Sequence, residues 1–125
     1  MLVGPLNRKA FSVQIEVRII TRDYELGLRL FDTRRFPSRY PKAVPGEAVV
    51  SSQSLTENEE SMEWTEIIDL VVDFDENCSV EMFANWLYGK LTVKPDDVYS
   101  LTIAGTTVEF DEAEIAHAVE EGLKR

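Results

Sequence analysis

Asp73, Asp75 and Asn77 alternate along one short stretch of this 125-residue chain, with the spacing that opens a calcium-binding loop. In such a loop, alternate side chains turn their oxygens toward one cation. The rest of the pattern is missing, because Cys78 occupies the position of the required glycine and Ala84 that of the bidentate glutamate. We therefore predict no metal site and no cofactor, and expect a strand end followed by helix-capping side chains.

Asp69, Asp73 and Asp75 fall on the same side of a predicted strand, so their carboxylates could instead serve acid–base chemistry or hold magnesium. General acid–base catalysis requires at least one carboxyl group with a shifted pKa, and nothing in the sequence indicates one. A solvated strand face explains these residues better. Whether the three carboxylates converge in a pocket is open, and a small metal-dependent hydrolase is the third interpretation of the chain.

Nucleophilic catalysis finds little support in the residue types present. The chain has one histidine, His117, predicted on the polar side of the last helix, and one cysteine, Cys78, surrounded by acids that disfavour a thiolate. No nucleophile elbow, phosphate-binding glycine loop or zinc-ligand spacing occurs. We predict no catalytic residues and favour a protein that is not an enzyme.

Charge is divided unevenly along the sequence. Residues 1–43 contain nine lysines and arginines against four acids, whereas the remainder has four basic and nineteen acidic residues, and the formal net charge is −10. Such asymmetry bears on partners and association rather than on fold. It predicts a polarised molecule, provided that the fold keeps the two charge groups apart.

The segment RRFPSRYPKAVPG, residues 34–46, concentrates this positive charge. Prolines at 37, 41 and 45 exclude a helix and favour a loop or an extended arm at about 33–46. Aromatic residues on the predicted first helix could add binding anchors, although core packing is the more common role of such residues. The predicted partner-binding residues are Arg34, Arg35, Phe36, Arg39, Tyr40, Lys42, Trp86 and Tyr88.

Three interpretations of this segment remain open: contact with an acidic protein surface, nucleic-acid binding through arginines and stacked aromatics, and an ordinary loop whose arginines pair within the chain. We rank protein contact first, because the acidic remainder of the molecule would repel a polyanion. The prediction is a cytoplasmic, non-catalytic binding protein, such as an adaptor, inhibitor or assembly subunit, that contacts itself or another protein and forms a homo-oligomer. A nucleic-acid or nucleotide-binding module is the alternative. No membrane span and no signal peptide are recognisable.

Hydrophobic periodicity predicts the elements that would carry the arm. Period-two alternation indicates a strand at 11–19 and a second strand at 24–30 that pairs back on it as a hairpin, with Gly27 weighing against a helix. The further predictions are a strand at 47–53, a polar connection at 54–61, a strand at 63–74, a helix near 78–91, and strands at 98–104 and 107–110 around a turn at 105–106.

The last helix has the clearest start. Asp111 and Glu114 have the spacing of a capping box, and Phe110 and Ile115 that of a hydrophobic staple. No repeat or linker divides the chain. The sequence thus predicts a single α+β domain over residues 1–125, with a mainly antiparallel sheet of about six strands and two helices packed on one face.

Overall fold

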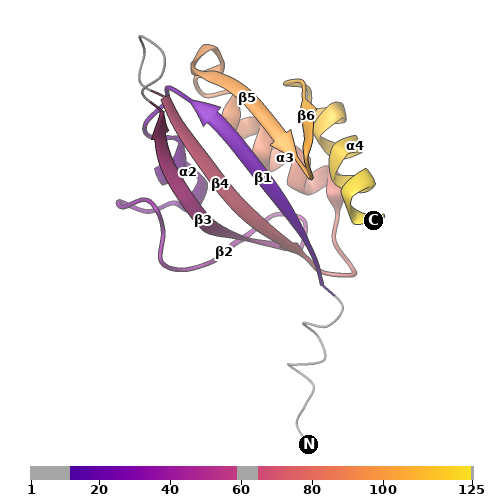
Figure 1. Cartoon of the computed structure of the whole chain (residues 1–125). Coiled ribbons are helices and arrows are strands. Elements are labelled where there is room, and N and C mark those ends of the chain that lie inside the picture. Colours follow the sequence, from indigo (N-terminus) through magenta and orange to yellow (C-terminus); the bar gives the residue numbers. More distant parts are fainter. Residues whose placement is uncertain (1–11, 59–64, 125) are drawn as a thin grey trace, which may run out of the picture.

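The computed structural model describes residues 12–58 and 65–124, in which six strands form one antiparallel sheet with the order β2-β3-β4-β1-β5-β6. Figure 1 shows this α+β arrangement. The elements are β1 (Val13–Thr21), α2 (Leu26–Phe31), β2 (Lys42–Val44), β3 (Ala48–Asn58), β4 (Thr65–Phe74), α3 (Val80–Leu91), the 3₁₀ turn η1 (Pro95–Asp97), β5 (Val98–Ile103), β6 (Thr106–Val108) and α4 (Glu112–Leu123). The predicted fold class is confirmed, with one helix more than expected. Phe11 and Trp64, expected in strands, lie outside the described residues.

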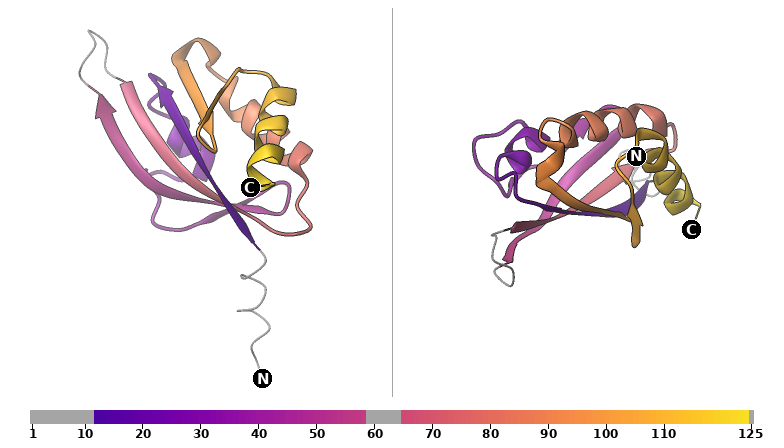
Figure 2. Two further views of the ribbon diagram at one scale, coloured as in Figure 1. Left: turned by 45° about the vertical axis from the view of Figure 1, so that its right-hand side comes forward. Right: turned by 90° about the horizontal axis from the view of Figure 1, so that it is seen from above.

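All three helices lie on one face of the sheet, as the view from above in Figure 2 shows. Strand β1 explains the two faces, since Ile15, Val17 and Ile19 are buried whereas the intervening Glu16 and Arg18 are exposed. A single strand therefore presents an apolar side to the helices and a polar side to solvent. We call this second side the open face.

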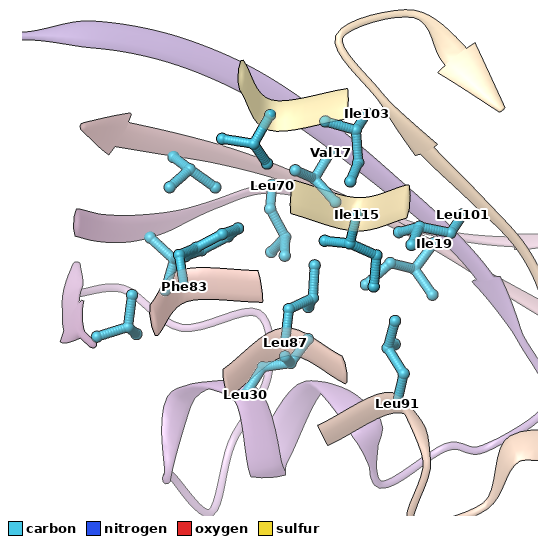
Figure 3. Packing of buried hydrophobic residues seen from close by; sticks show 14 of the residues in the cluster. Val17, Ile19, Leu30, Leu70, Phe83, Leu87, Leu91, Leu101, Ile103 and Ile115 are labelled. Atoms are coloured by element: carbon cyan, nitrogen blue, oxygen red, sulfur yellow. The ribbon is translucent and has the colours of Figure 1, made fainter. Parts of the chain in front are cut away.

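The core fills the space between the sheet and the helices. Figure 3 shows Leu87 and Leu91 of α3 and Ile115 of α4 packed with Val17 and Ile19 of β1, and each of these side chains is at most 2% exposed. Burying a large aliphatic side chain contributes roughly 1.5–3 kcal/mol, so this layer is the main source of stability. It provides a rigid base for the segments at its margin.

Short polar side chains cap the N-termini of the two long helices, α3 and α4. Ser79 Oγ accepts the backbone N–H of Met82 at 3.3 Å at the start of α3, and Asp111 Oδ1 accepts the N–H of Ala113 at 3.3 Å at the start of α4. The full capping box is absent, because the backbone N–H of Asp111 donates to the carbonyl of Glu109 instead of to Glu114. The predicted helices at these positions are nevertheless confirmed.

The predicted strand at 24–30 is wrong, because Leu26–Phe31 forms α2. Alternate leucines suggested a strand, yet Leu26, Leu30 and Phe31 share the buried side of a helix and Leu28 is only half-buried. The helix ends at Asp32, whose φ of 51° is left-handed.

Two strand boundaries also differ from the prediction. The third predicted strand continues through 54–58, where we expected a polar connection, because Leu55 packs against the core and the whole length of β3 pairs with β4. The sixth strand is β2, at the end of the proline-punctuated segment, since its residues 42–44 lie between Pro41 and Pro45 and pair with β3.

The hairpin between β5 and β6 is confirmed with its turn one residue earlier than predicted. Ala104 and Gly105 have φ values of 51° and 82°, the positive pair that a tight two-residue hairpin turn requires. Among the described residues, no helix has the length and apolar character needed to cross a membrane.

Candidate functional site

The basic segment, residues 33–46 and hereafter the arm, leaves the end of α2 and returns to the sheet edge as β2 (Figure 1). Its last residues pair with β3 in the register Lys42↔Val50 and Val44↔Ala48. The arm is therefore fixed to the sheet at one end and continuous with a helix at the other. It is neither a free tail nor wholly without regular structure.

Phe36 holds the first half of the arm against α2. Its ring lies so close to Gly27 that a Cβ there would be 2.5 Å from the ring, and its centroid is 5.4 Å from that of Phe31. Glycine at position 27 makes room for this contact. Phe36, a predicted partner-binding residue, is half-buried in an intramolecular contact and can offer a partner only its remaining surface.

Gly46 fixes the other end of the arm to α3. Its φ is +96°, and a Cβ at this position would lie 2.5 Å from the carbonyl oxygen of Ser79. The Gly46 carbonyl also accepts the backbone N–H of Ser79 at 3.0 Å. A side chain here would disturb both the arm and the start of α3.

The charged side chains of the arm differ from these anchors in their exposure to solvent. Arg34, Arg35 and Arg39 are exposed, and none of them forms an ion pair with another residue of the described ranges. Tyr40 is 71% exposed. Lys42 lies 3.9 Å from Asp32, an exposed and long contact of little strength. Three guanidinium groups are thus available to a ligand.

Three arginines between Ser12 and the arm are paired instead. Arg18 on β1 donates to both carboxylate oxygens of Asp69, at 2.7 and 3.0 Å. Arg22 lies 3.2 Å from Asp97 Oδ1. The hypothesis that the arginines pair within the chain therefore holds for Arg18 and Arg22 but not for the arginines of the arm.

Asp23 forms the most buried of these pairs. Its side chain is 1% exposed and accepts hydrogen bonds from the guanidinium of Arg29 and from the backbone N–H of Glu25, the latter at 3.1 Å. Burial by itself raises the pKa of Asp23, but the hydrogen bonds outweigh it and hold the pKa below its ordinary value. The carboxylate thus fixes the start of α2, and through α2 the base of the arm.

The aspartates considered for metal binding do not converge. Asp69 and Asp73 share the open face but lie four residues apart on β4, a separation of about 13 Å. The hydrogen bond from Arg18 lowers the pKa of Asp69, assisted by Ser54, which suits a permanently charged carboxylate better than a proton donor. No group of three or more potential metal-ligating side chains occurs in residues 12–58 and 65–124.

The remaining reactive side chains, Cys78 and His117, form no hydrogen bond with each other. Cys78 is half-buried before α3, and burial raises the pKa of its thiol, as does the charge of Asp75. A thiol with a raised pKa carries less of the reactive thiolate. His117 is exposed on α4.

Trp86 and Tyr88, the two predicted partner-binding residues of α3, lie on different sides of the helix. They are two positions apart, which is about 200° around the helix axis, and both are half-buried against the core. Trp86 packs on Phe83 with 5.7 Å between ring centroids and lines a shallow hollow of about 460 Å³ with Pro45, Met82, Glu81 and Asn85. Tyr88 is not among the residues that line it.

This hollow joins the end of the arm to α3. Met82, 56% exposed, and Pro45 were missed by the sequence analysis. The i, i+4 spacing of Met82 and Trp86 could have indicated a shared helix face, but nothing in the sequence places Pro45 beside them. The candidate site is the arm with this apolar hollow at its end.

No family model, curated protein or solved structure matches this chain.

Proposed function

We propose that the protein is a non-catalytic binding protein whose arm docks on an acidic surface of a partner protein. The observation that carries this proposal is the exposure of Arg34, Arg35 and Arg39 without an ion-pair partner among the described residues. Guanidinium groups form strong bidentate contacts with carboxylates, so the arm attracts an acidic surface locally although the chain as a whole has a net charge of −10.

The anchoring of the arm supports this role. Phe36 and Gly46 fix its two halves before any partner arrives, so less conformational entropy is lost on binding than with a free tail. The hollow beside Trp86 offers room for one apolar side chain next to the charged contacts. An adaptor, an inhibitor or an assembly subunit, acting in the cytoplasm, would use such a surface.

A titration with a fluorescein-labelled polyglutamate peptide tests the charge recognition. We expect salt-sensitive binding that weakens about tenfold in the Arg34→Ala/Arg35→Ala/Arg39→Ala variant, since three exposed pairs at roughly 0.5 kcal/mol each give that factor. The matched control, Lys90→Ala/Lys94→Ala/Lys124→Ala, removes the same charge elsewhere. It should bind like the wild type.

A single-stranded DNA of matched charge separates the alternatives. Exposed Tyr40 beside Arg39 would also suit base stacking. Submicromolar, salt-sensitive DNA binding that the arm variant loses, together with no binding of polyglutamate, would replace the proposal with a nucleic-acid function. Equal effects of the arm and control variants would show that the arm is not the site.

A further inference from the structure

The outer side of α4 is exposed and acidic. Ile115 and Val119, both 0% exposed, fix the inner side of this helix to the core. The exposed acids of α4 and of the two residues that lead into it, hereafter the acidic end, are Glu109, Asp111, Glu114, Glu120 and Glu121. Lys124, 3.5 Å from Glu121, makes the only ion pair with the acidic end within residues 12–58 and 65–124.

The acidic end and the arm lie at opposite ends of the molecule. The arm leads into β2 at one margin of the six-stranded sheet, and α4 follows β6 at the other margin. In the helical layer α3 contacts both α2, which precedes the arm, and α4, and Figures 1 and 2 show α2 and α4 on opposite sides of it. Five strand spacings of about 4.8 Å separate the two margins by roughly 24 Å, about three Debye lengths at physiological salt. The arm is therefore too far from the acidic end of its own copy to pair with it.

The two surfaces are complementary in charge. The arm presents three arginines and the acidic end presents four carboxylates, none of which forms an ion pair with another described residue. Guanidinium and carboxylate groups make strong, often bidentate hydrogen bonds. The net charge of −10 opposes the approach of two copies, but salt screens charges more than about 8 Å apart, so the groups that meet at the contact decide its orientation.

Both surfaces are held in place before they meet. Phe36 and Gly46 anchor the arm, and the buried side of α4 fixes the acidic end, so little conformational entropy is lost on contact. On the basis of the arm function proposed above, we propose that the acidic surface on which the arm docks is the acidic end of a second copy of this chain. The contact joins two different surfaces, so it is a head-to-tail contact.

Self-association in solution tests this proposal. Sedimentation equilibrium of the wild type should give a mass that rises with concentration above the 14.2 kDa of one chain and falls as salt is added. Removing either surface should raise the dissociation constant about tenfold, since each of three exposed pairs contributes a factor of about two to three. The two variants are Arg34→Ala/Arg35→Ala/Arg39→Ala, the arm variant, and Glu114→Gln/Glu120→Gln/Glu121→Gln, the acidic-end variant.

A matched control separates this contact from a general effect of charge. Glu16→Gln/Glu47→Gln/Glu76→Gln removes three exposed acids outside the acidic end. It changes the net charge by the same amount as the acidic-end variant and lowers the general repulsion between copies equally. We expect it to associate at least as strongly as the wild type.

Mixing the two interface variants tests the pairing itself. The arm variant keeps its acidic end and the acidic-end variant keeps its arm, so one contact of the wild-type kind can form between them. At a concentration at which each variant alone is a monomer, the mixture should contain a 1:1 complex of twice the mass of one chain. Association through any other surface would not be restored by mixing.

Several results would overturn the proposal: a wild type that is monomeric at all concentrations, no complex in the mixture, or equal weakening by the acidic-end variant and the control. A monomeric wild type whose acidic end binds polylysine would assign that end to a different basic partner. The acidic-end variant should still bind polyglutamate, because its arm is intact. Failure of this proposal is therefore distinguishable from failure of the arm function, in which the arm variant would bind polyglutamate like the wild type.

Discussion

The arginines before and after Asp32 have different surroundings although the sequence presents them as one basic region. Arg18, Arg22 and Arg29 pair with carboxylates of the sheet, of η1 and of the start of α2. The arm arginines lie outside those contacts and face solvent. The first set stabilises the frame, and the second remains available for binding. Net charge along a sequence therefore overstates the charge that a partner can reach.

Removing the buried carboxylate should give the largest effect on stability. Asp23→Asn leaves Arg29 without its charged partner, and breaking such a pair costs about 3 kcal/mol of the free energy of unfolding. Urea denaturation measures this. The control Asp32→Asn changes a carboxylate that is 87% exposed and should shift stability by less than about 0.5 kcal/mol. Equal losses in both variants would contradict the contrast between the two regions.

Two matched glycine substitutions should separate the arm anchor from ordinary helix propensity. In Gly27→Ala the new methyl group meets the ring of Phe36, so we expect a loss of about 1–3 kcal/mol. In Gly89→Ala nothing lies within 4 Å of the new atom, and the helix should gain about 0.5–1 kcal/mol. Thermal denaturation under one set of conditions gives both values. Stabilisation by both substitutions would show that Phe36 does not hold the arm there.

Acid should weaken the paired region through Asp23 and Asp69. Both folded-state pKa values are lowered, so their stabilising contribution is complete above the unfolded-state pKa of about 4 and is lost as the pH falls through the folded values. Urea midpoints between neutral pH and pH 2 should fall for the wild type, less steeply for Asp23→Asn. The pH dependence of the Asp69→Asn variant should differ less from that of the wild type than the pH dependence of Asp23→Asn does, because Arg18, the partner of Asp69, is half-exposed. A flat wild-type profile would contradict these pairings.

The sequence predicted the elements whose periodicity agrees with their burial. Strands β1 and β4 alternate cleanly, and α3 and α4 have polar caps and one apolar side. Helix α2 was missed because six residues are too few to establish a period of 3.6, and its Gly27 is explained by Phe36, which follows nine residues later beyond the end of the helix. Strand β2 was not predicted because prolines flank its three residues, although an edge strand tolerates prolines at such positions.

The candidate site was predicted in composition but not in geometry. The arm was located by its prolines and arginines, whereas its anchoring and the hollow with Pro45 and Met82 depend on contacts between distant segments. Which arginines are paired depends equally on the sheet register, since Arg18 meets Asp69 only because β1 pairs with β4. No local pattern contains that information.

Chemical labelling of arginine tests most directly whether the two sets differ. Phenylglyoxal modifies accessible guanidinium groups, and mass spectrometry after brief exposure of the native protein gives a rate for each arginine. Among the six arginines between Ser12 and Lys124, we predict that Arg34, Arg35 and Arg39 react fastest and that Arg29, held by buried Asp23, reacts most slowly. Arm arginines that react as slowly as Arg29 would contradict the claim that the arm is free to bind a partner.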